Sequence, residues 1–238
     1  AEAAVSTDSL VGYWKFDETS GTSATDSSGD GNTGTHTNSP TISTDVPSVT
    51  GFPNKRSLSF DGTDDYVTLP TAVSNQTFAN MSTCAWAKID STGAVDYHGI
   101  YGNNQPFGRM LIVNSSAGTV LIENGNGTFF GDGPDFRNTW THFCYTYNQS
   151  AGTEYLYQNG IEIGSKARTG NITGAATALQ IGDGYPPADT TYNFKGLLDD
   201  VRIYSRALSA GEIAELAAGN HTTAVWDGSS STDWETAA

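Results

Sequence analysis

The chain has 238 residues and a formal net charge of −15, because 26 acidic side chains are set against only 11 lysines and arginines. So few basic residues argue against a nucleic-acid partner, and no apolar stretch approaches the ~18 residues of a membrane span. The 11% aromatic content and 27 glycines, with many Ser, Thr, Asn and Asp residues, favour numerous short strands joined by turns.

The first predicted strand covers Leu10–Phe16, and a long polar, glycine-rich stretch follows it from Asp17 to about Gly51. That stretch shows no periodic apolar signal, so we expect a loop there. Strand character resumes over Ser57–Leu69 and is interrupted by a turn at Asp61–Asp65.

Short segments with apolar alternation continue as far as residue 204 and predict further strands. They lie at Ser82–Ile89, His98–Tyr101, Arg109–Val113, Thr119–Glu123, Thr141–Tyr147, Ala178–Ile181 and Gly196–Tyr204. A hairpin is predicted over Glu154–Ile163, because its Asn159-Gly160 dipeptide suits a two-residue type I′ turn.

One helix is expected after the last strand. Ser209 and Glu212 have the spacing of a capping box, Ile213 and Leu216 supply an apolar stripe, and Gly219 is a suitable stop. We expect this helix to pack over one end of the β-structure.

These features divide the chain into three parts. Residues 1–6 form an N-terminal tail, residues 7–219 form one all-β domain, and residues 220–238 form a linker or the start of a following module. A disordered tail is the alternative for the last part, because the segment is polar and its two tryptophans have no partner strand.

Three segments resemble the laminin G-like, concanavalin A-like jelly-roll family: YWKFDETSG (13–21), SLSFDGTDDYVTLP (57–70) and FKGLLDDVRIYSRALSAGEI (194–213). The resemblance implies an all-β fold, a two-sheet antiparallel jelly-roll β-sandwich with one short C-terminal helix. It also implies a carbohydrate-binding or adhesion module of a secreted, multi-modular protein.

The two cysteines, Cys84 and Cys144, stand mid-strand in segments similar to the disulfide-bearing strands of the related pentraxins. The resemblance therefore implies a Cys84–Cys144 disulfide, as is common in secreted proteins. Two buried free thiols are the alternative.

The last strand carries two adjacent carboxylates with different expected surroundings. Strict alternation places Asp199 in register with Val201, so we expect it to point inward, where a buried carboxylate needs a compensating cation. Asp200 shares the opposite face with Arg202 and is expected to be solvated.

A second group of oxygen ligands lies in the early glycine-rich loop, where Asp26, Ser28, Asp30 and Asn32 alternate. The resemblance implies a structural Ca²⁺ that ties this loop to the closing strand. The candidate metal ligands are Asp17, Asp26, Asn32 and Asp199. A solvated turn, with Asp199 bonded to backbone amides, is the alternative.

Aromatic and polar residues concentrate in three predicted loops, at 97–107, 129–136 and 183–192. Aromatic faces and planar polar groups are the side chains that bind sugars. The candidate ligand-binding residues are Asn103, Asn104, Arg109, Asp183, Tyr185 and Tyr192. Ordinary packing of loop aromatics is the alternative reading.

The sequence thus predicts a non-catalytic, calcium-stabilised, lectin-like module of a larger secreted or cell-surface protein. Its expected partners are a glycan or cell-surface polysaccharide and neighbouring modules of the same polypeptide, with no nucleic acid and no membrane insertion. We expect no enzyme activity, because no strand carries the paired carboxylates of a glycosidase. An adhesion or spacer domain is the main alternative, and a glycosidase is a further one.

Overall fold

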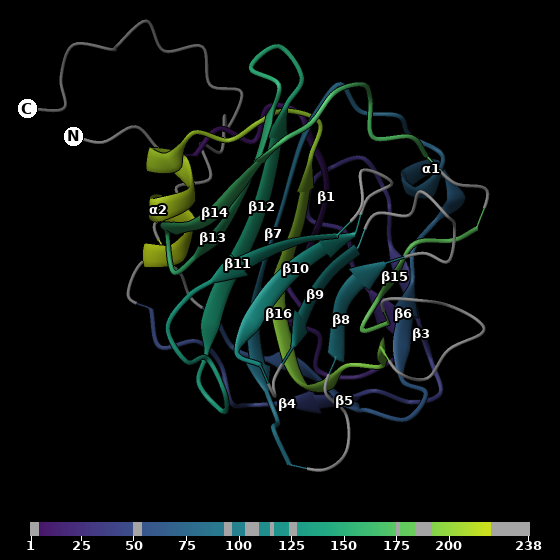
Figure 1. The fold of residues 1–238 in the computed structure, drawn as a ribbon. Helices are drawn as coiled ribbons and strands as arrows, with labels where there is room; N and C mark the ends of the chain where they lie inside the picture. The colour runs from purple at the N-terminus through teal and green to yellow at the C-terminus, as the bar shows by residue number, and fades with distance from the viewer. Residues whose placement is uncertain are drawn as a thin grey trace, which may run out of the picture.

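A computed structural model describes residues 5–49, 54–92, 97–102, 110–114, 117–123, 128–174, 177–183 and 192–219. They form two antiparallel β-sheets that pack face to face, with one short C-terminal helix (Figure 1). The predicted concanavalin A-like jelly-roll sandwich is therefore confirmed. Neither helix in this described part of the chain combines the length and apolar character that a membrane crossing requires.

The first sheet, sheet A, has the order β14-β13-β12-β7-β16-β5-β4, and β1 also pairs with β16. Its strands are β1 (Leu10–Trp14), β4 (Thr41–Ser43), β5 (Ser57–Asp61), β7 (Asn80–Ile89), β12 (Thr141–Asn148), β13 (Thr153–Gln158), β14 (Ile161–Ala167) and β16 (Lys195–Tyr204). One edge of β16 pairs with β7, while the other edge is divided between β5 and β1. The closing strand therefore holds both early strands of sheet A.

The second sheet, sheet B, has the order β11-β10-β9-β8-β15-β6-β3-β2. Its strands are β2 (Ser23–Ala24), β3 (Gly34–Thr37), β6 (Tyr66–Thr68), β8 (Tyr97–Gly102), β9 (Met110–Asn114), β10 (Thr119–Glu123), β11 (Thr128–Asp132) and β15 (Gln180–Ile181). The short helix α1 (Thr71–Ser74) follows β6.

The space between the sheets is filled by apolar side chains that recur at every second strand position. On β7, for example, Ala85, Ala87 and Ile89 face this core. Large aromatic rings such as Trp14 and Phe143 are fully buried there, and burial of such rings is the main stabilising contribution of the sandwich.

Most strand predictions are confirmed, and β10 has the predicted bounds. The hairpin turn is also confirmed, because Asn159 and Gly160 have the φ values of 50° and 80° that a type I′ turn needs. The expectation of a loop from Asp17 to Gly51 is wrong in part, since β2, β3 and β4 lie within it. Each is only two to four residues long, too short to show a period.

The C-terminal helix α2 (Ala210–Ala218) begins with the predicted capping box between Ser209 and Glu212 and ends at Gly219, whose φ is 77°. Its expected position was wrong. Ile213 and Leu216 pack with Cys84 and Cys144 in a second apolar cluster, so α2 covers the outer face of sheet A rather than an end of the sandwich (Figure 1).

The predicted disulfide is confirmed. Cys84 on β7 and Cys144 on β12 are direct cross-strand partners, with their Cα atoms 4.1 Å apart and their sulfurs bonded. Because their neighbours in the strands face the core, the two sulfurs lie on the outer face of sheet A.

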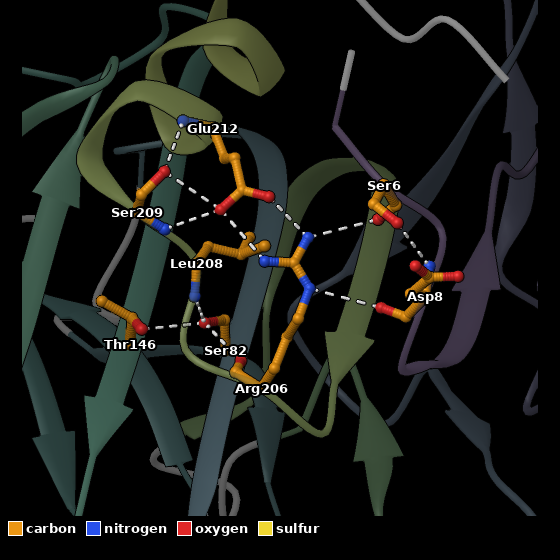
Figure 2. A network of polar contacts seen from close by, with 8 residues as sticks. All are labelled: Ser6, Asp8, Ser82, Thr146, Arg206, Leu208, Ser209 and Glu212. Atoms are coloured by element: carbon orange, nitrogen blue, oxygen red, sulfur yellow. Dashed lines mark hydrogen bonds and ion pairs between the residues drawn. The ribbon is translucent and has the colours of Figure 1, made fainter. Parts of the chain in front are cut away.

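Arg206 ties the start of the described chain to helix α2 (Figure 2). Its guanidinium donates to the backbone oxygens of Ser6 and Asp8, each at 3.3 Å, and to the Glu212 carboxylate at 2.6 and 3.0 Å. Glu212 also accepts from the backbone N–H of Ser209. The N-terminal segment and the C-terminal helix are therefore held at one place.

Candidate functional site

The closing strand β16 contains a β-bulge that changes the direction of Asp199. The register with β7 shifts between Asp199 and Arg202, and Asp200 has a φ of 55°. Leu198 and Val201 both face the core, which strict alternation would not allow. The prediction that Asp199 points inward with Val201 is therefore wrong, and Asp199 lies on the outer face of sheet A.

Asp200 was expected to be solvated, and it is buried. It accepts hydrogen bonds from the hydroxyl of Tyr13 and from the guanidinium of Arg202. The Arg202 guanidinium also lies 4.0 Å from the centre of the Tyr13 ring. These contacts from β1 and β16 hold the bulged residue in place, and they compensate its charge.

Asp199 is fully buried (0% exposed) although it faces outward. The amide of Asn54 donates to its Oδ2 atom. Within the described residues, Asp199 Oδ1 and Asn54 Oδ1 have no hydrogen-bond partner. Burial first, then the charge of Asp200 and that of nearby Asp17, raise the pKa of Asp199 to about 9, against the effect of the Asn54 hydrogen bond.

Asp17 accepts the backbone N–H groups of Lys55 and Arg56 with its Oδ1 atom, at 2.9 and 3.1 Å. It therefore holds the segment that carries Asn54 against the end of β1. Two of the predicted metal ligands, Asp17 and Asp199, thus come close together. Asn54 joins them, and nothing in the sequence pattern pointed to it.

The other two predicted ligands, Asp26 and Asn32, lie in a turn of their own. Both Asp26 oxygens are engaged: they accept from the backbone N–H groups of Tyr13, Ser28 and Asn32 and from the Ser28 hydroxyl. Burial works against ionisation, but these hydrogen bonds outweigh it and lower the pKa of Asp26. The Asn32 amide donates to the Val11 carbonyl. Metal binding by this pair stays a prediction.

A further acidic group that could hold a metal ion consists of Asp61, Asp64 and Asp65, whose ligand oxygens lie within 4.8 Å of one another. They occupy the turn in which the chain passes from β5 of sheet A to β6 of sheet B. Burial, with the charges of the other two carboxylates, raises the pKa of Asp65. The sequence pattern predicted only a turn at this segment.

The predicted ligand-binding residues are only partly described. Asn103, Asn104, Arg109 and Tyr185 lie outside the described residues. Asp183 is buried and forms an isolated bridge with Asn193, so it offers little surface to a ligand. Tyr192 is half-buried, and its ring centre lies 5.6 Å from that of Tyr97.

An aromatic surface on sheet B was missed by sequence reasoning, which treated residues 129–136 as one loop. Residues Thr128–Asp132 form β11, in which Phe129 is buried while Phe130 is 56% exposed. Phe130 pairs across the strands with Leu121, and Leu121 packs against Tyr97 and Tyr192. We call Tyr97, Leu121, Phe130 and Tyr192 the aromatic strip.

The strip lies on the outer face of sheet B. Val120 and Ile122, which flank Leu121 on β10, both face the core, so Leu121 and its partner Phe130 point the other way. Phe130 is the exposed member of the strip, Tyr97 and Tyr192 are half-buried, and Leu121 packs against them and is buried. The sequence of residues 128–132, TFFGD, does not alternate between apolar and polar residues, and the available strand signal was the β-favouring run Thr128-Phe129-Phe130.

The sequence model of the concanavalin A-like lectin/glucanases superfamily matches residues 61–214. No curated protein matches the chain significantly. Among solved structures, domain 4 of AbnA, a GH43 extracellular arabinanase from Geobacillus stearothermophilus in complex with arabinotriose, is similar with a TM-score of 0.61 at 22% identity. The match covers 87% of this chain and 98% of that domain.

Two further similar structures are parts of longer proteins. A Trypanosoma rangeli sialidase mutant displaying trans-sialidase activity has a TM-score of 0.64 at 18% identity, over 91% of this chain and 34% of its own. The receptor binding domain of botulinum neurotoxin D has a TM-score of 0.61 at 17% identity. The match covers 90% of this chain and 53% of that domain. The chain thus spans about half of the toxin domain and a third of the sialidase, and these likenesses concern the fold.

Proposed function

The chain belongs to the concanavalin A-like lectin/glucanases superfamily, and from this membership we propose that it is a non-catalytic, calcium-stabilised carbohydrate-binding module. We place it in a larger secreted or cell-surface protein, where its disulfide would persist. Its ligand in this proposal is a neutral glycan or polysaccharide.

The observation that carries the proposal is the aromatic strip. The exposed ring of Phe130 continues through Leu121 to the paired rings of Tyr97 and Tyr192. Aromatic faces bind the C–H surfaces of sugar rings, and tyrosine hydroxyls can bond sugar hydroxyls. Because the rings lie on sheet strands and beside them, the surface is held rigidly, which lowers the cost of ordering it on binding.

The arabinanase domain supports the choice of ligand class. It is similar over nearly its whole length and was solved with arabinotriose bound. At this level of identity the likeness concerns the fold, so arabinotriose is a first probe rather than an assigned ligand.

The absence of catalysis is part of the proposal, since the superfamily also includes glucanases. Glycosidases need two carboxyl groups that flank an accessible sugar linkage. Glu154, the most buried glutamate among the described residues, lies inside the sandwich instead. It accepts from the Tyr145 hydroxyl at 3.0 Å and lies 3.7 Å from the Arg168 guanidinium. Release of reducing sugar when the protein is incubated with a panel of polysaccharides would contradict the proposed absence of catalysis.

The calcium site is proposed at Asp199, Asn54 and Asp17. Two buried oxygens there, Asp199 Oδ1 and Asn54 Oδ1, have no hydrogen-bond partner among the described residues, and oxygen ligands with carboxylate charge suit Ca²⁺. When bound, the ion would neutralise the buried carboxylate and tie the segment at Asn54 to β16. The role is structural, and no ligand contact is assigned to it.

A glycan array, read with calcium and with chelator, tests the function. We expect saturable binding to a neutral glycan that is weakened in Phe130→Ala and unchanged in Ile161→Ala, a matched control because Ile161 is 70% exposed on β14 of the other sheet. A blank array, with thermal stabilisation by calcium intact, would favour the adhesion or spacer alternative.

A further inference from the structure

A cavity of about 550 Å³ with both polar and apolar lining residues opens on the opposite sheet from the aromatic strip. Its lining includes Ser59, Leu197 and Lys88, which are cross-strand neighbours on β5, β16 and β7. Their neighbours Leu58 and Leu198 face the core, so these three side chains point to the outer face of sheet A. The cavity is therefore distinct from the proposed calcium site and from the aromatic strip, and it shares only Asp61 with the acidic turn.

The backbone at this place permits close approach of the strands. Gly196 lies between Leu197 and Lys195 with a φ of 135°, and a Cβ atom there would stand 2.2 Å from the Lys88 carbonyl oxygen. Only glycine allows β16 and β7 to pair here without displacement. Gly196 and the apolar side chain of Leu197 both line the cavity.

Some lining groups have hydrogen-bonding capacity that the described contacts do not use. Asp61 accepts two backbone N–H groups with Oδ1 only, which leaves Oδ2. The Lys88 ammonium donates once, to Asp45 at 2.6 Å, and has three protons. Ser59 adds a hydroxyl on the same face. The lining therefore combines an acceptor, a donor and a hydroxyl that can be both with the apolar side chain of Leu197.

The charges of the lining decide between ligand classes. Two carboxylates, Asp61 and Asp90, are matched by two ammonium groups, Lys88 and Lys195. Both lysines already form ion pairs, Lys88 with Asp45 and Lys195 with Asp90 at 3.2 Å. An anion therefore meets lysines that are already neutralised. A cation is drawn instead to the neighbouring acidic turn, where the Asp61, Asp64 and Asp65 oxygens lie within 4.8 Å of one another, and it would leave Ser59, Lys88 and Leu197 unused. A neutral molecule with several hydroxyl groups can use every free donor and acceptor.

From this arrangement we infer that the sheet A cavity is a second carbohydrate site, which binds one neutral sugar unit. Its C–H face rests on Leu197, and its hydroxyls bond Ser59, Asp61 and Lys88. The cavity volume lies within the range of small-molecule pockets. The site goes beyond the proposed function, because it stands on different residues of the opposite sheet and does not depend on the aromatic strip.

The experiment is a titration of ¹⁵N-labelled full chain with glucose, galactose, arabinose and arabinotriose, followed by amide chemical shifts. We expect at least one sugar to shift the amides of Ser59, Asp61 and Leu197 saturably. The variants Ser59→Ala and Lys88→Met should each weaken that binding by roughly three- to tenfold, the effect of one lost hydrogen bond. Both residues are half-exposed, so both variants should fold.

Matched controls are Ser165→Ala and Lys166→Met on β14, the outermost strand of the same sheet, and they should leave the shifts unchanged. Phe130→Ala should leave them unchanged as well, which separates the cavity from the strip. If no sugar shifts the cavity amides, or if acetate or glycine shifts them more strongly, the inference fails. Shifts at Leu121 and Phe130 alone would leave the proposed function standing.

Discussion

Cys84 and Cys144 face each other across the β7–β12 ladder, and their disulfide lies beneath helix α2 on the outer face of sheet A. Val5, Leu10 and Tyr204 join Leu216 in the same apolar cluster. The bond is thus part of a small second core that unites the first strand, the closing strand and the helix.

Replacing both cysteines, as Cys84→Ala/Cys144→Ala, should destabilise the protein by roughly 4 kcal/mol, because the bond closes a loop of about 60 residues in the unfolded chain. Chemical denaturation checks this value. Hydrogen exchange should also rise first in α2, which packs on the pair. Equal stability of the variant and the wild type would contradict a stabilising role.

Substitution of Phe130 by alanine should weaken glycan binding by about fivefold to tenfold, since a stacked aromatic ring contributes about 1 kcal/mol. The side chain is 56% exposed, so the free energy of unfolding should change little. Calorimetry with the best glycan of the array gives the affinity, and Ile161→Ala is the control. A loss of affinity shared by both variants would point to a general surface effect.

Chelation should lower the melting temperature of the wild type, because Asp199 and Asn54 would lose their ion. In Asp199→Asn, the melting temperature should no longer respond to calcium, and in chelator the variant should melt above the wild type because a buried carboxylate is gone. Asp135→Asn is the control, as Asp135 is exposed and paired with Arg137. If the wild type has the same melting temperature with calcium and with chelator, the calcium site is excluded.

The anchoring of α2 should depend on pH through Glu212. The hydrogen bond from Arg206 is the largest cause that lowers the pKa of this carboxyl below its ordinary 4.5. A lowered pKa stabilises the fold above pH 4.5, and this contribution is lost as the pH falls further. The protection factors of the helix amides, which correct for the intrinsic pH dependence of exchange, should therefore fall below about pH 4.5, and Glu212→Gln should remove that fall.

Glu215→Gln, the same change on the same helix, serves as the control for that experiment and should keep the pH dependence of the wild type. If Glu212→Gln and the wild type respond alike to acid, the Arg206 contact does not anchor the helix. The capping hydrogen bond from Glu212 N–H to Ser209 remains available in both variants.

Local signals in the sequence predicted what local chemistry controls. Asn159-Gly160 fixed a hairpin, and Ser209 with Glu212 fixed the start of a helix, because each pattern has one favourable backbone conformation. The position of α2 was not predictable, since it depends on where the disulfide and Tyr204 place an apolar surface.

The candidate site was predictable only in its chemistry. Asp199 was recognised as a buried carboxylate, but its direction depends on the bulge at Asp200. Asp200 adopts a positive φ without being glycine. It is held in this conformation by Tyr13, which is distant in the sequence, and by Arg202, which follows the bulge in the same strand. Asn54 and Phe130 were missed because their roles arise from partners far away in the chain.

The Arg206 clamp also has a mechanical consequence. Residues 6–8 and helix α2 meet at one guanidinium, so the described chain enters and leaves the sandwich side by side. Tension applied through residues 6–8 and helix α2 would act first on the Arg206 contacts and on the pairing of β1 with β16. Both lie outside sheet B. Under the proposed function, a glycan at Phe130 would stay bound while the clamp opens.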